Sequence, residues 1–292
     1  VDRRSGAYKI CYELQRTFLF LAGSDKRSFD TKNLVTACKH LKLYYSVTSQ
    51  NDTREFCDKL MATIDESKIQ RLTCCLRRCF GGQTIGQSNF RDCGHVSETR
   101  DSFTTIEIPV KDMHTLERAF QSYVRSEVMD GADAIHCDMC GQKRVGIRRT
   151  CFDINKLPKC LIIHLKRFVT DMVTGDLVKV QDKLEFPNKL DMAPFTGQVL
   201  DAKSGVKPKP RHYNLKGVIV HDGDLNTGHY FSYIQDRETH RWYHFDDENV
   251  IPFDPGRIED ECFGGGKGRK KRSAYMLFYE EVDDESNFQQ NN

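Results

Sequence analysis

The sequence has 292 residues, of which 38% are hydrophobic and 29% are charged, and its formal net charge is +2. These values are typical of a soluble globular protein with a substantial core. No run of about 18 apolar residues and no signal-peptide pattern is present, which argues against a membrane-spanning or secreted chain. We therefore expect an intracellular protein, cytoplasmic and/or nuclear, that binds neither membranes nor nucleic acid.

The 12 cysteines do not form a disulfide framework. Only Cys137-x-x-Cys140 has the tight spacing of metal ligands, and the others are scattered through apolar segments. Buried free thiols in a reducing compartment explain this distribution. A basic run at 266–272 is expected to be a solvated loop rather than a nucleic-acid site, as most short basic runs are, and the acidic residues before it partly cancel its field.

The first part of the chain predicts a small helical subdomain. Residues 8–22 carry apolar side chains near helical spacing, and Gly23 and Ser24 end the pattern. A second helix is expected over 31–41, and a third runs to about 64 with Asp52 as its N-cap. The side chains expected to share the apolar faces of the three helices are Ile10, Leu14, Phe18 and Leu21, then Leu34, Val35 and Cys38, then Phe56, Leu60 and Ile64.

From Cys79 onward, glycine-punctuated alternating segments predict an extended β unit. Strands are expected at 103–110, 148–154, 160–168 and 213–221, with one helix over 115–126. A loop containing Lys207 to Pro210 separates the last two strands, and residues 283–292 read as a frayed tail.

The stretch 221–250 predicts a β-hairpin, because two alternating apolar runs flank a polar turn. His229 heads its first strand and Asp246 ends its second, so the two side chains are expected to meet across the pair. A carboxylate that accepts the Nδ1–H of an imidazole leaves Nε2 free to take a proton from a nucleophile. Asp247 is the competing carboxylate, and alternation says only that the two acids point to opposite faces.

These segments resemble the ubiquitin-specific protease family. GVIVHDGDLNTGHYFSYI (217–234), WYHFDDENV (242–250) and SAYMLFYEE (273–281) are similar to its histidine box, acid box and closing strand. NDTREF (51–56) resembles its glutamine-aspartate box, and LPKCLIIHLKRF (157–168) resembles its central palm strand. Details such as DGADAIHCDMC (130–140), EFPNKLDMAPF (185–195) and ECFGG (261–265) are similar to the large, fat-facets-like members.

The resemblance implies an α+β, papain-like cysteine protease fold with a helical thumb, β-rich fingers and a β palm. The thumb would span 1–78, the fingers 79–156 and the palm 157–282, followed by the tail at 283–292. It also implies cleavage after the terminal glycine of ubiquitin by acyl transfer to a cysteine. The partners would be ubiquitin and ubiquitylated proteins. His229 would act as base and later as acid, and FDDE matches the family motif with Asp246 as its orienter.

The family's cysteine box, Gly-x-Thr-Cys-Tyr-x-Asn, is absent from the sequence. Cys11-Tyr12 matches the Cys-Tyr pair of this motif. Cys11 falls within a helical pattern rather than at the start of a helix, however, so we expect a packed thiol. The nucleophile is expected upstream of Val1, and this chain alone is expected to be inactive.

Substrate contacts are also implied by the resemblance. Asp52 and Glu55 would lie beside the arginine-bearing ubiquitin tail, with helix capping as the alternative for Asp52. The loops 222–228 and 196–211 would flank the cleft, and Gly228 would permit close approach of the substrate backbone. Tyr230 is assigned to substrate binding, although packing beneath His229 is the favoured interpretation of its side chain.

A structural zinc is the one cofactor considered. In the family an earlier cysteine pair completes a four-cysteine site with the later pair, here Cys137 and Cys140. The corresponding place reads Phe90 to His95, so that Phe90 replaces one cysteine, Cys93 remains and His95 is the candidate fourth ligand. A turn with spare thiols and no metal is the open alternative.

Two other functions remain open at this point. The first is a catalytically inactive module that binds ubiquitin, which would lack the nucleophile. The second is a zinc-dependent scaffold without affinity for ubiquitin.

Overall fold

The computed structural model describes residues 5–26, 28–41, 52–67, 69–197, 210–225, 227–266 and 271–282. The chain forms two compact units, Val1–Cys79 and Phe80–Asn292. This division falls one residue after the predicted end of the thumb. The finer boundaries at 156/157 and 282/283 stay predictions, and the tail at 283–292 lies outside the described residues.

The first unit is helical, as its sequence pattern predicts. Its elements are α1 (Gly6–Gly23), α2 (Lys32–Cys38), η1 (Lys39–Leu41), α3 (Thr53–Glu66) and α4 (Gln70–Phe80). The side chain of Ser5 caps α1 by accepting from the backbone N–H of Tyr8 at 3.2 Å. The unit has a small core of Ile10, Ala37, Cys38 and Leu41, against which Leu14, Leu34, Phe56 and Leu60 pack.

Four apolar side chains of this unit do not join the core as the helical pattern predicts. Ile64 is partly buried on α3 but is not among the side chains packed against the core. Val35 is 52% exposed, because Leu34, Ala37 and Cys38 already form the buried line of α2 at spacing i, i+3, i+4. Phe18 and Leu21 are 63% and 70% exposed, since the core takes only Ile10 and Leu14 from α1. The pattern therefore predicts the helices correctly but overestimates how much of each is covered.

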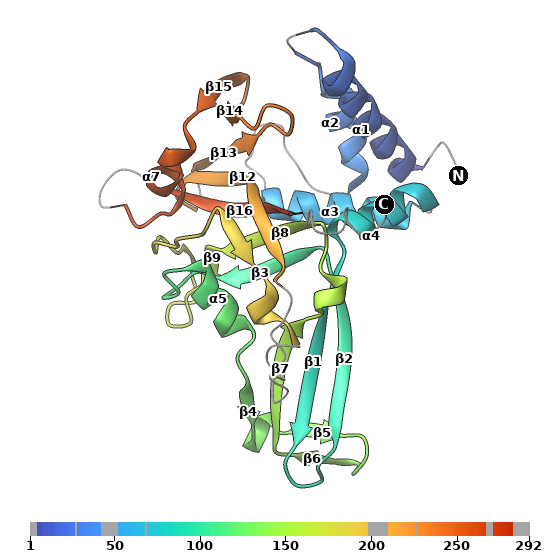
Figure 1. Cartoon of the computed structure of the whole chain (residues 1–292), viewed down its shortest axis with the longest axis vertical. Coiled ribbons are helices and arrows are strands. Elements are labelled where there is room, and N and C mark those ends of the chain that lie inside the picture. Colours follow the sequence, from blue (N-terminus) through green and yellow to red (C-terminus); the bar gives the residue numbers. More distant parts are fainter. Residues whose placement is uncertain are drawn as a thin grey trace, which may run out of the picture. The chain divides into compact units, whose positions relative to one another are not determined.

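An eight-stranded sheet dominates the second unit (Figure 1), with strand order β15-β14-β13-β12-β16-β8-β3 and with β11 paired to β12 beside this path. All neighbours are antiparallel except β3 and β8, which run parallel. The strands are β3 (Thr105–Pro109), β8 (Cys160–Lys166), β11 (Lys189–Asp191), β12 (His212–Gly223), β13 (Gly228–Gln235), β14 (Trp242–Asp246), β15 (Asn249–Phe253) and β16 (Arg272–Glu281).

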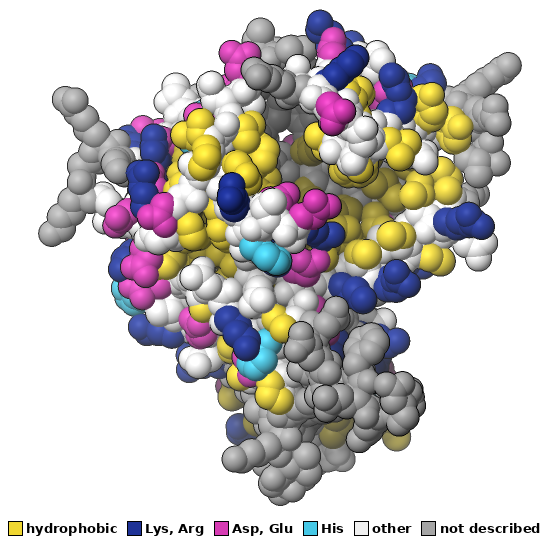
Figure 2. Space-filling view, turned by 45° about the horizontal axis from the view of Figure 1, so that its top comes forward, with side chains coloured by type: hydrophobic (Ala, Val, Ile, Leu, Met, Phe, Trp, Pro, Cys, Tyr) yellow, Lys and Arg dark blue, Asp and Glu magenta, His cyan; other side chains and the backbone are white. Residues whose placement is uncertain are grey.

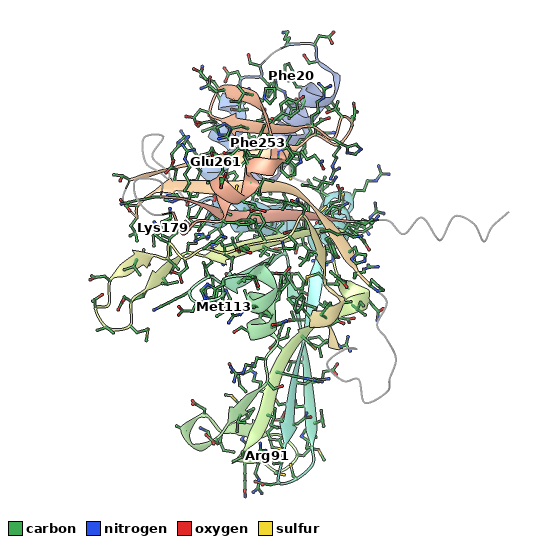
Figure 3. All side chains as sticks on the ribbon, turned by 60° about the vertical axis from the view of Figure 1, so that its left-hand side comes forward. Phe20, Arg91, Met113, Lys179, Phe253 and Glu261 are labelled. Atoms are coloured by element: carbon green, nitrogen blue, oxygen red, sulfur yellow. The ribbon has the colours of Figure 1, made fainter. Side chains whose placement is uncertain are left out.

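A second sheet, in the order β2-β1-β7-β4, extends away from the eight-stranded sheet (Figure 1). The short hairpin of β5 and β6 lies at its far end, and Arg91 marks this end in Figure 3. The strands are β1 (Gly82–Phe90), β2 (Val96–Phe103), β4 (Glu127–Met129), β5 (Ile135–Cys137), β6 (Gln142–Arg144) and β7 (Gly146–Phe152). The strand predicted over 103–110 is therefore split, with Phe103 ending β2 and Thr105 beginning β3.

The remaining elements cover or connect the two sheets. Thr115 caps α5 by accepting from Arg118 N–H at 3.2 Å, and β9 and β10 form a separate hairpin. These elements are α5 (Leu116–Tyr123), η2 (Gly131–Asp133), η3 (Ile154–Lys156), β9 (Phe168–Thr170), β10 (Leu177–Lys179), η4 (Ala193–Phe195), η5 (Pro255–Arg257) and α7 (Ile258–Cys262). The predicted α+β class is confirmed.

The large core of the second unit lies between the eight-stranded sheet and the elements that cover it. Ile163, Leu165, Val220 and Leu277 are completely or almost completely buried there, together with Phe120 of α5. Burial of such side chains contributes about 1.5–3 kcal/mol each, so this core holds the strands of the sheet in place.

Charged side chains of both signs are interspersed over the described part of the face in Figure 2. None of the helices in the described residues has both the length and the apolar character needed to cross a membrane.

Candidate active site

His229 and Asp246 meet across two neighbouring strands, as the hairpin pattern predicts. His229 is the second residue of β13 and Asp246 is the last residue of β14. The register pairs Ser232 with Phe245 and Gln235 with Trp242. His229 Nε2 lies 2.5 Å from Asp246 Oδ1, and the two side chains are 45% and 39% exposed. The pair is therefore made between neighbouring strands and remains partly open to solvent.

The nitrogen that contacts the carboxylate is not the predicted one. We expected Nδ1–H to donate to the carboxylate, but Nε2 holds that place. Strand register fixes which residues face each other, whereas rotation of the ring about its side-chain bonds decides which nitrogen points inward. With Nε2 directed at Asp246, Nδ1 is the nitrogen left to exchange a proton with a nucleophile.

Asp247 belongs to the same cluster but occupies a different backbone position. It lies in the turn after β14 with φ 49°, and its carboxylate is within 4.8 Å of the ligand atoms of His229 and Asp246. Only Asp246 is hydrogen-bonded to the imidazole. This geometry supports Asp246 as the orienting residue and leaves Asp247 as an exposed neighbour.

Two further residues on the same face of the sheet escaped the sequence prediction. Asp222 pairs in register with His229, and Arg272 donates from Nε to Asp222 Oδ2 at 2.5 Å. Arg272 also donates to Glu261 Oε2 at 2.9 Å and lies 5.5 Å from the centre of the Phe231 ring. The hydrogen bond with Asp222 raises the pKa of Arg272.

Arg272 therefore holds the Asp222 carboxylate in a hydrogen bond, across the strand pair from His229. Strand pairing alone could have identified Asp222, because it lies across from His229. Arg272 was assigned to a solvated basic loop, and this assignment is wrong, because Arg272 begins β16 and is paired with Asp222. Lys271 is exposed and lies outside the strand, as predicted, and it pairs with Asp224. Residues 267–270 of the same run lie outside the described residues.

Tyr230 does not pack beneath His229, contrary to our expectation. Successive side chains of a strand point to opposite faces, and Phe231 rather than Tyr230 shares the face of His229, with the two rings 6.5 Å apart. The Tyr230 ring lies 4.8 Å from His221 and 5.5 Å from Tyr275. It is only partly buried there, so a substrate contact on that face stays a prediction.

The turn that leads into His229 depends on two glycines. Gly223 has φ 120°, and a Cβ there would lie 2.3 Å from Thr227 O. A Cβ on Gly228 would lie 2.2 Å from His221 Nε2. The structure thus gives Gly228 a reason to be glycine within the chain itself, while close approach of a substrate stays a prediction.

Asp52 and Glu55 lie on the first unit. Asp52 caps α3 by accepting from the N–H groups of Arg54 at 2.8 Å and Glu55 at 3.3 Å. Glu55 is exposed in the first turn of the helix. The capping alternative is thereby confirmed for Asp52, and contact of both residues with a substrate tail stays a prediction. Asn51 and residues 198–209 of the proposed flanking loop lie outside the described residues.

Cys11 has the environment of a packed thiol. It is 9% exposed in the middle of the first half of α1, and burial raises its pKa. A nucleophilic cysteine needs the opposite shift, toward the thiolate. Within the described part of the second unit, no cysteine sulfur is hydrogen-bonded to His229.

Three of the four predicted metal ligands, Cys93, Cys137 and Cys140, come together at the tip of the β2-β1-β7-β4 sheet. The sulfur atoms of Cys93, Cys137 and Cys140 all lie within 4.8 Å of one another, and those of Cys93 and Cys137 are 3.7 Å apart. His95 Nδ1 lies 3.4 Å from Cys137 Sγ. A hydrogen bond from the backbone of His95 lowers the pKa of Cys93, with Cys140 and Cys137 acting in the same direction. This cluster could hold a metal ion.

Comparison with known proteins agrees with this arrangement. The sequence profile of the family described as "Ubiquitin carboxyl-terminal hydrolase" matches residues 2–279. "Ubiquitin carboxyl-terminal hydrolase 24" of Mus musculus is 31% identical over 319 residues, which is 95% of this chain and 12% of that protein.

Two further curated relatives show the same degree of similarity. "Ubiquitin carboxyl-terminal hydrolase 34" of Homo sapiens is 31% identical, covering 94% of this chain and 9% of that protein. "Probable ubiquitin carboxyl-terminal hydrolase FAF" of Drosophila melanogaster is 31% identical, covering 94% of this chain and 11% of that protein. The chain therefore spans between 9% and 12% of the length of these relatives.

Proposed function

The chain belongs to the ubiquitin carboxyl-terminal hydrolase family, and we propose from this premise that it carries the catalytic histidine and aspartate of a cysteine-type deubiquitinase. The reaction is hydrolysis of the peptide or isopeptide bond that follows the terminal glycine of ubiquitin. The observation that carries the proposal is the 2.5 Å contact between His229 Nε2 and Asp246 Oδ1.

The geometry assigns a task to each of the two residues. His229 Nδ1 accepts the proton of a cysteine thiol, and the thiolate attacks the carbonyl carbon of the terminal glycine of ubiquitin. The same nitrogen then gives the proton to the departing amine, and water hydrolyses the thioester with His229 acting again as base. Asp246 holds the ring in position and stabilises the imidazolium formed in each half-reaction. Cys11 is a poor match to the nucleophile, because burial raises its pKa.

Ubiquitin and ubiquitylated proteins are the proposed partners. The ubiquitin tail is extended and bears arginines, which favours acidic side chains along its path. We assign Asp52 and Glu55 to this role on the first unit, and Gly228 and Tyr230 on the second. The cytoplasm and/or nucleus is the proposed location, and neither nucleic acid nor membrane is a proposed partner.

Ubiquitin carrying an electrophile at its C-terminus tests the hydrolase. Covalent labelling of the protein that contains this chain, lost in His229→Ala and kept in His136→Ala, supports the proposal. His136 is an exposed histidine of β5 and serves as the matched control. Binding of ubiquitin without any labelling would favour a catalytically inactive ubiquitin-binding module, and absence of binding would contradict both functions.

We further propose that the cysteine cluster holds one structural zinc ion, with His95 as its fourth ligand. Tetrahedral Zn–S bonds of about 2.3 Å place two sulfur atoms roughly 3.8 Å apart, and Cys93 and Cys137 are separated by 3.7 Å. His95 Nδ1 lies 3.4 Å from Cys137 Sγ, but His95 is outside the group whose ligand atoms all lie within 4.8 Å of one another, so its ring would have to turn to complete the site. The ion would fix the tip of the sheet and take no part in the reaction.

Metal analysis of the purified protein tests this site. About one equivalent of zinc per chain is expected, falling to near zero in Cys137→Ser. His95→Ala is expected to weaken zinc binding about 10–100-fold in a chelator competition. Well under one equivalent in the unaltered protein would remove the proposal, and an unchanged affinity in His95→Ala would remove His95 from the ligand set.

A further inference from the structure

Lys179 makes an unusual set of contacts with the strand that leads to His229. It is the last residue of β10, and its side chain extends from the β9–β10 hairpin toward the eight-stranded sheet (Figure 3). Nζ donates to three backbone carbonyl oxygens, those of Gly223 at 2.7 Å, Lys271 at 2.8 Å and His221 at 3.2 Å. A lysine ammonium has three N–H donors, so every one of them has a backbone acceptor.

The three carbonyl groups lie around the turn that leads into His229. His221 and Gly223 belong to the end of β12, where the register pairs Gly223 with Gly228 and Asp222 with His229. Lys271 directly precedes β16, the other neighbour of β12. One ammonium group therefore joins the hairpin β9–β10, the end of β12 and the beginning of β16.

The neighbouring cations hold the same turn in a different manner. Lys271 pairs with the side chain of Asp224, and Arg272 pairs with the side chain of Asp222. Partly exposed pairs between flexible side chains constrain the backbone weakly. Lys179 instead binds main-chain atoms on both sides of Asp222, so it constrains the path of the backbone itself.

The environment of Lys179 is consistent with an ammonium group withdrawn from water. Burial lowers the pKa of Lys179 to about 8, and the nearby charge of Arg167 acts in the same direction. Charged groups taken from water are held by the hydrogen bonds they make, and here all three acceptors are carbonyl oxygens.

We propose that Lys179 is a positioning residue for His229. Its ammonium fixes the carbonyl groups of His221 and Gly223, and this sets the backbone path by which the next strand brings the imidazole to Asp246. In the part of the chain that the structure describes, Lys179 makes no hydrogen bond to the imidazole, and it acts through the carbonyl groups of His221 and Gly223. The importance of this positioning for function rests on the proposed role of His229. The hydrogen bonds between Lys179 and the backbone do not depend on that role.

The test compares Lys179→Met with Lys216→Met by NMR of the whole chain, without ubiquitin. Methionine keeps the length of the side chain and removes the charge and all three donors. Lys216 is a matched control, because it also lies on the β12–β13 pair but donates only to the Gln235 side chain, at 2.9 Å. The two readouts are the imidazole resonances of His229 and the hydrogen exchange of the Asp224 amide, which donates to Thr227 O at 2.8 Å.

In Lys179→Met the His229 resonances are expected to shift, and exchange at Asp224 is expected to quicken about tenfold or more, because a charge-assisted hydrogen bond is lost. Amides of β8 should exchange as in the unaltered protein, and Lys216→Met should change neither readout. Unchanged His229 resonances in Lys179→Met would overturn the proposal.

A variant that unfolds is also informative. Lys179→Gln keeps two N–H donors and is measured in the same way if Lys179→Met does not fold. Loss of protection at β8 together with Asp224 in both variants would show a stabiliser of the whole unit and overturn the positioning role. Because neither readout needs ubiquitin, failure of the ubiquitin assays and failure of this proposal are distinguishable.

Discussion

Two aspartates follow one another at the end of β14, and their backbone conformations separate their roles. Asp246 keeps the extended conformation of the strand, which aims its carboxylate at His229. Asp247 adopts φ 49° in the turn, a conformation that asparagine also tolerates. Substitution of each by asparagine therefore removes the charge without disturbing the turn.

In the protein that contains this chain, Asp246→Asn is expected to reduce hydrolysis of a fluorogenic ubiquitin C-terminal amide about 100-fold or more, because the orienting carboxylate of such a pair is worth that much. Asp247→Asn should leave the rate within roughly threefold of the unaltered enzyme, since only Asp246 is hydrogen-bonded to the imidazole. A larger loss in Asp247→Asn than in Asp246→Asn would reverse the assignment.

Cys57 offers a prediction of pH dependence. Burial raises its pKa to about 11, and the charge of Asp58 adds to this effect. Because a raised pKa leaves less thiolate at neutral pH, alkylation of Cys57 by iodoacetamide should still quicken about tenfold per unit between pH 8 and 10. A small reference thiol levels off near its own pKa of about 8.5. Peptide mass spectrometry follows the labelling, and a plateau for Cys57 below pH 9 would contradict the buried thiol.

The histidine–aspartate pair could be predicted from the sequence because β-strands have a strict period of two. Two alternating runs joined by a polar turn place the head of one strand near the end of the other, and His229 and Asp246 occupy those places. The choice of Nε2 over Nδ1 could not be predicted, since it depends on ring rotation. Lys179 could not be found either, because nothing in the pattern brings β10 next to the end of β12.

At the scale of elements, Asp52 combines the capping of α3 with a proposed contact to ubiquitin. Asp52→Ala removes an acceptor for two backbone N–H groups and is expected to lower the free energy of unfolding of the first unit by about 1 kcal/mol. Asp52→Ser keeps a capping oxygen and should restore most of this loss. Urea unfolding followed by circular dichroism measures both changes.

The serine variant also separates the two roles of Asp52. If ubiquitin affinity falls in Asp52→Ser while stability is kept, the charge of Asp52 serves the ubiquitin tail. If affinity follows stability in both variants, Asp52 is a cap alone and its assignment to substrate binding is wrong.

Arg167 joins several elements through its guanidinium. It is fully buried and donates to the carbonyl oxygens of Ala274 at 2.7 Å, Asp182 at 3.0 Å, Val180 at 3.1 Å and Phe263 at 3.4 Å. Arg167→Met leaves these buried acceptors without their donor, so a loss of about 3 kcal/mol or more is expected in urea unfolding.

The control for Arg167 is an exposed arginine of the same unit. Arg237 is paired to Glu280 with its own side chain 74% exposed, and Arg237→Met should cost less than about 1 kcal/mol. Similar losses in the two variants would show that the buried hydrogen bonds of Arg167 contribute little.

The sequence predicts a helix or strand well where one of its faces is buried and the other is exposed. It predicts poorly where few side chains of the element are buried. The strands around His229 alternate clearly, and the pattern finds them. α4 was not predicted, although its polar and apolar residues lie on separate faces, and Leu76 is its one buried residue. The break between β2 and β3 was missed although the alternation changes phase there. Phe103 is out of phase with the apolar residues from Ile106 onward, and the partner strand changes at the same point.

At the scale of the whole molecule, the two units differ in the size of their cores. The described core of the first unit consists of Ile10, Ala37, Cys38 and Leu41, whereas that of the second extends over most strands of the eight-stranded sheet. Local opening needs less free energy where fewer apolar side chains are buried.

Hydrogen exchange followed by mass spectrometry should therefore show two levels of protection. Amides of α1, α2 and α3 are expected to exchange about tenfold faster or more than those of β8, β12 and β16. Equal protection throughout would mean that the chain opens as one cooperative body.

The register of β13 and β14 has a consequence for insertions and deletions. The connection between them, residues 236–241, is fixed by hydrogen bonds such as Asp236 N–H to Arg241 O at 2.9 Å. One residue added to or removed from it could offset the strands by a single position and send the carboxylate to the reverse side of the sheet. The same offset would take Trp242 out of the core, because Trp242 and Asp246 share one face of β14. The length of this connection therefore matters to the histidine–aspartate pair as directly as the identity of Asp246.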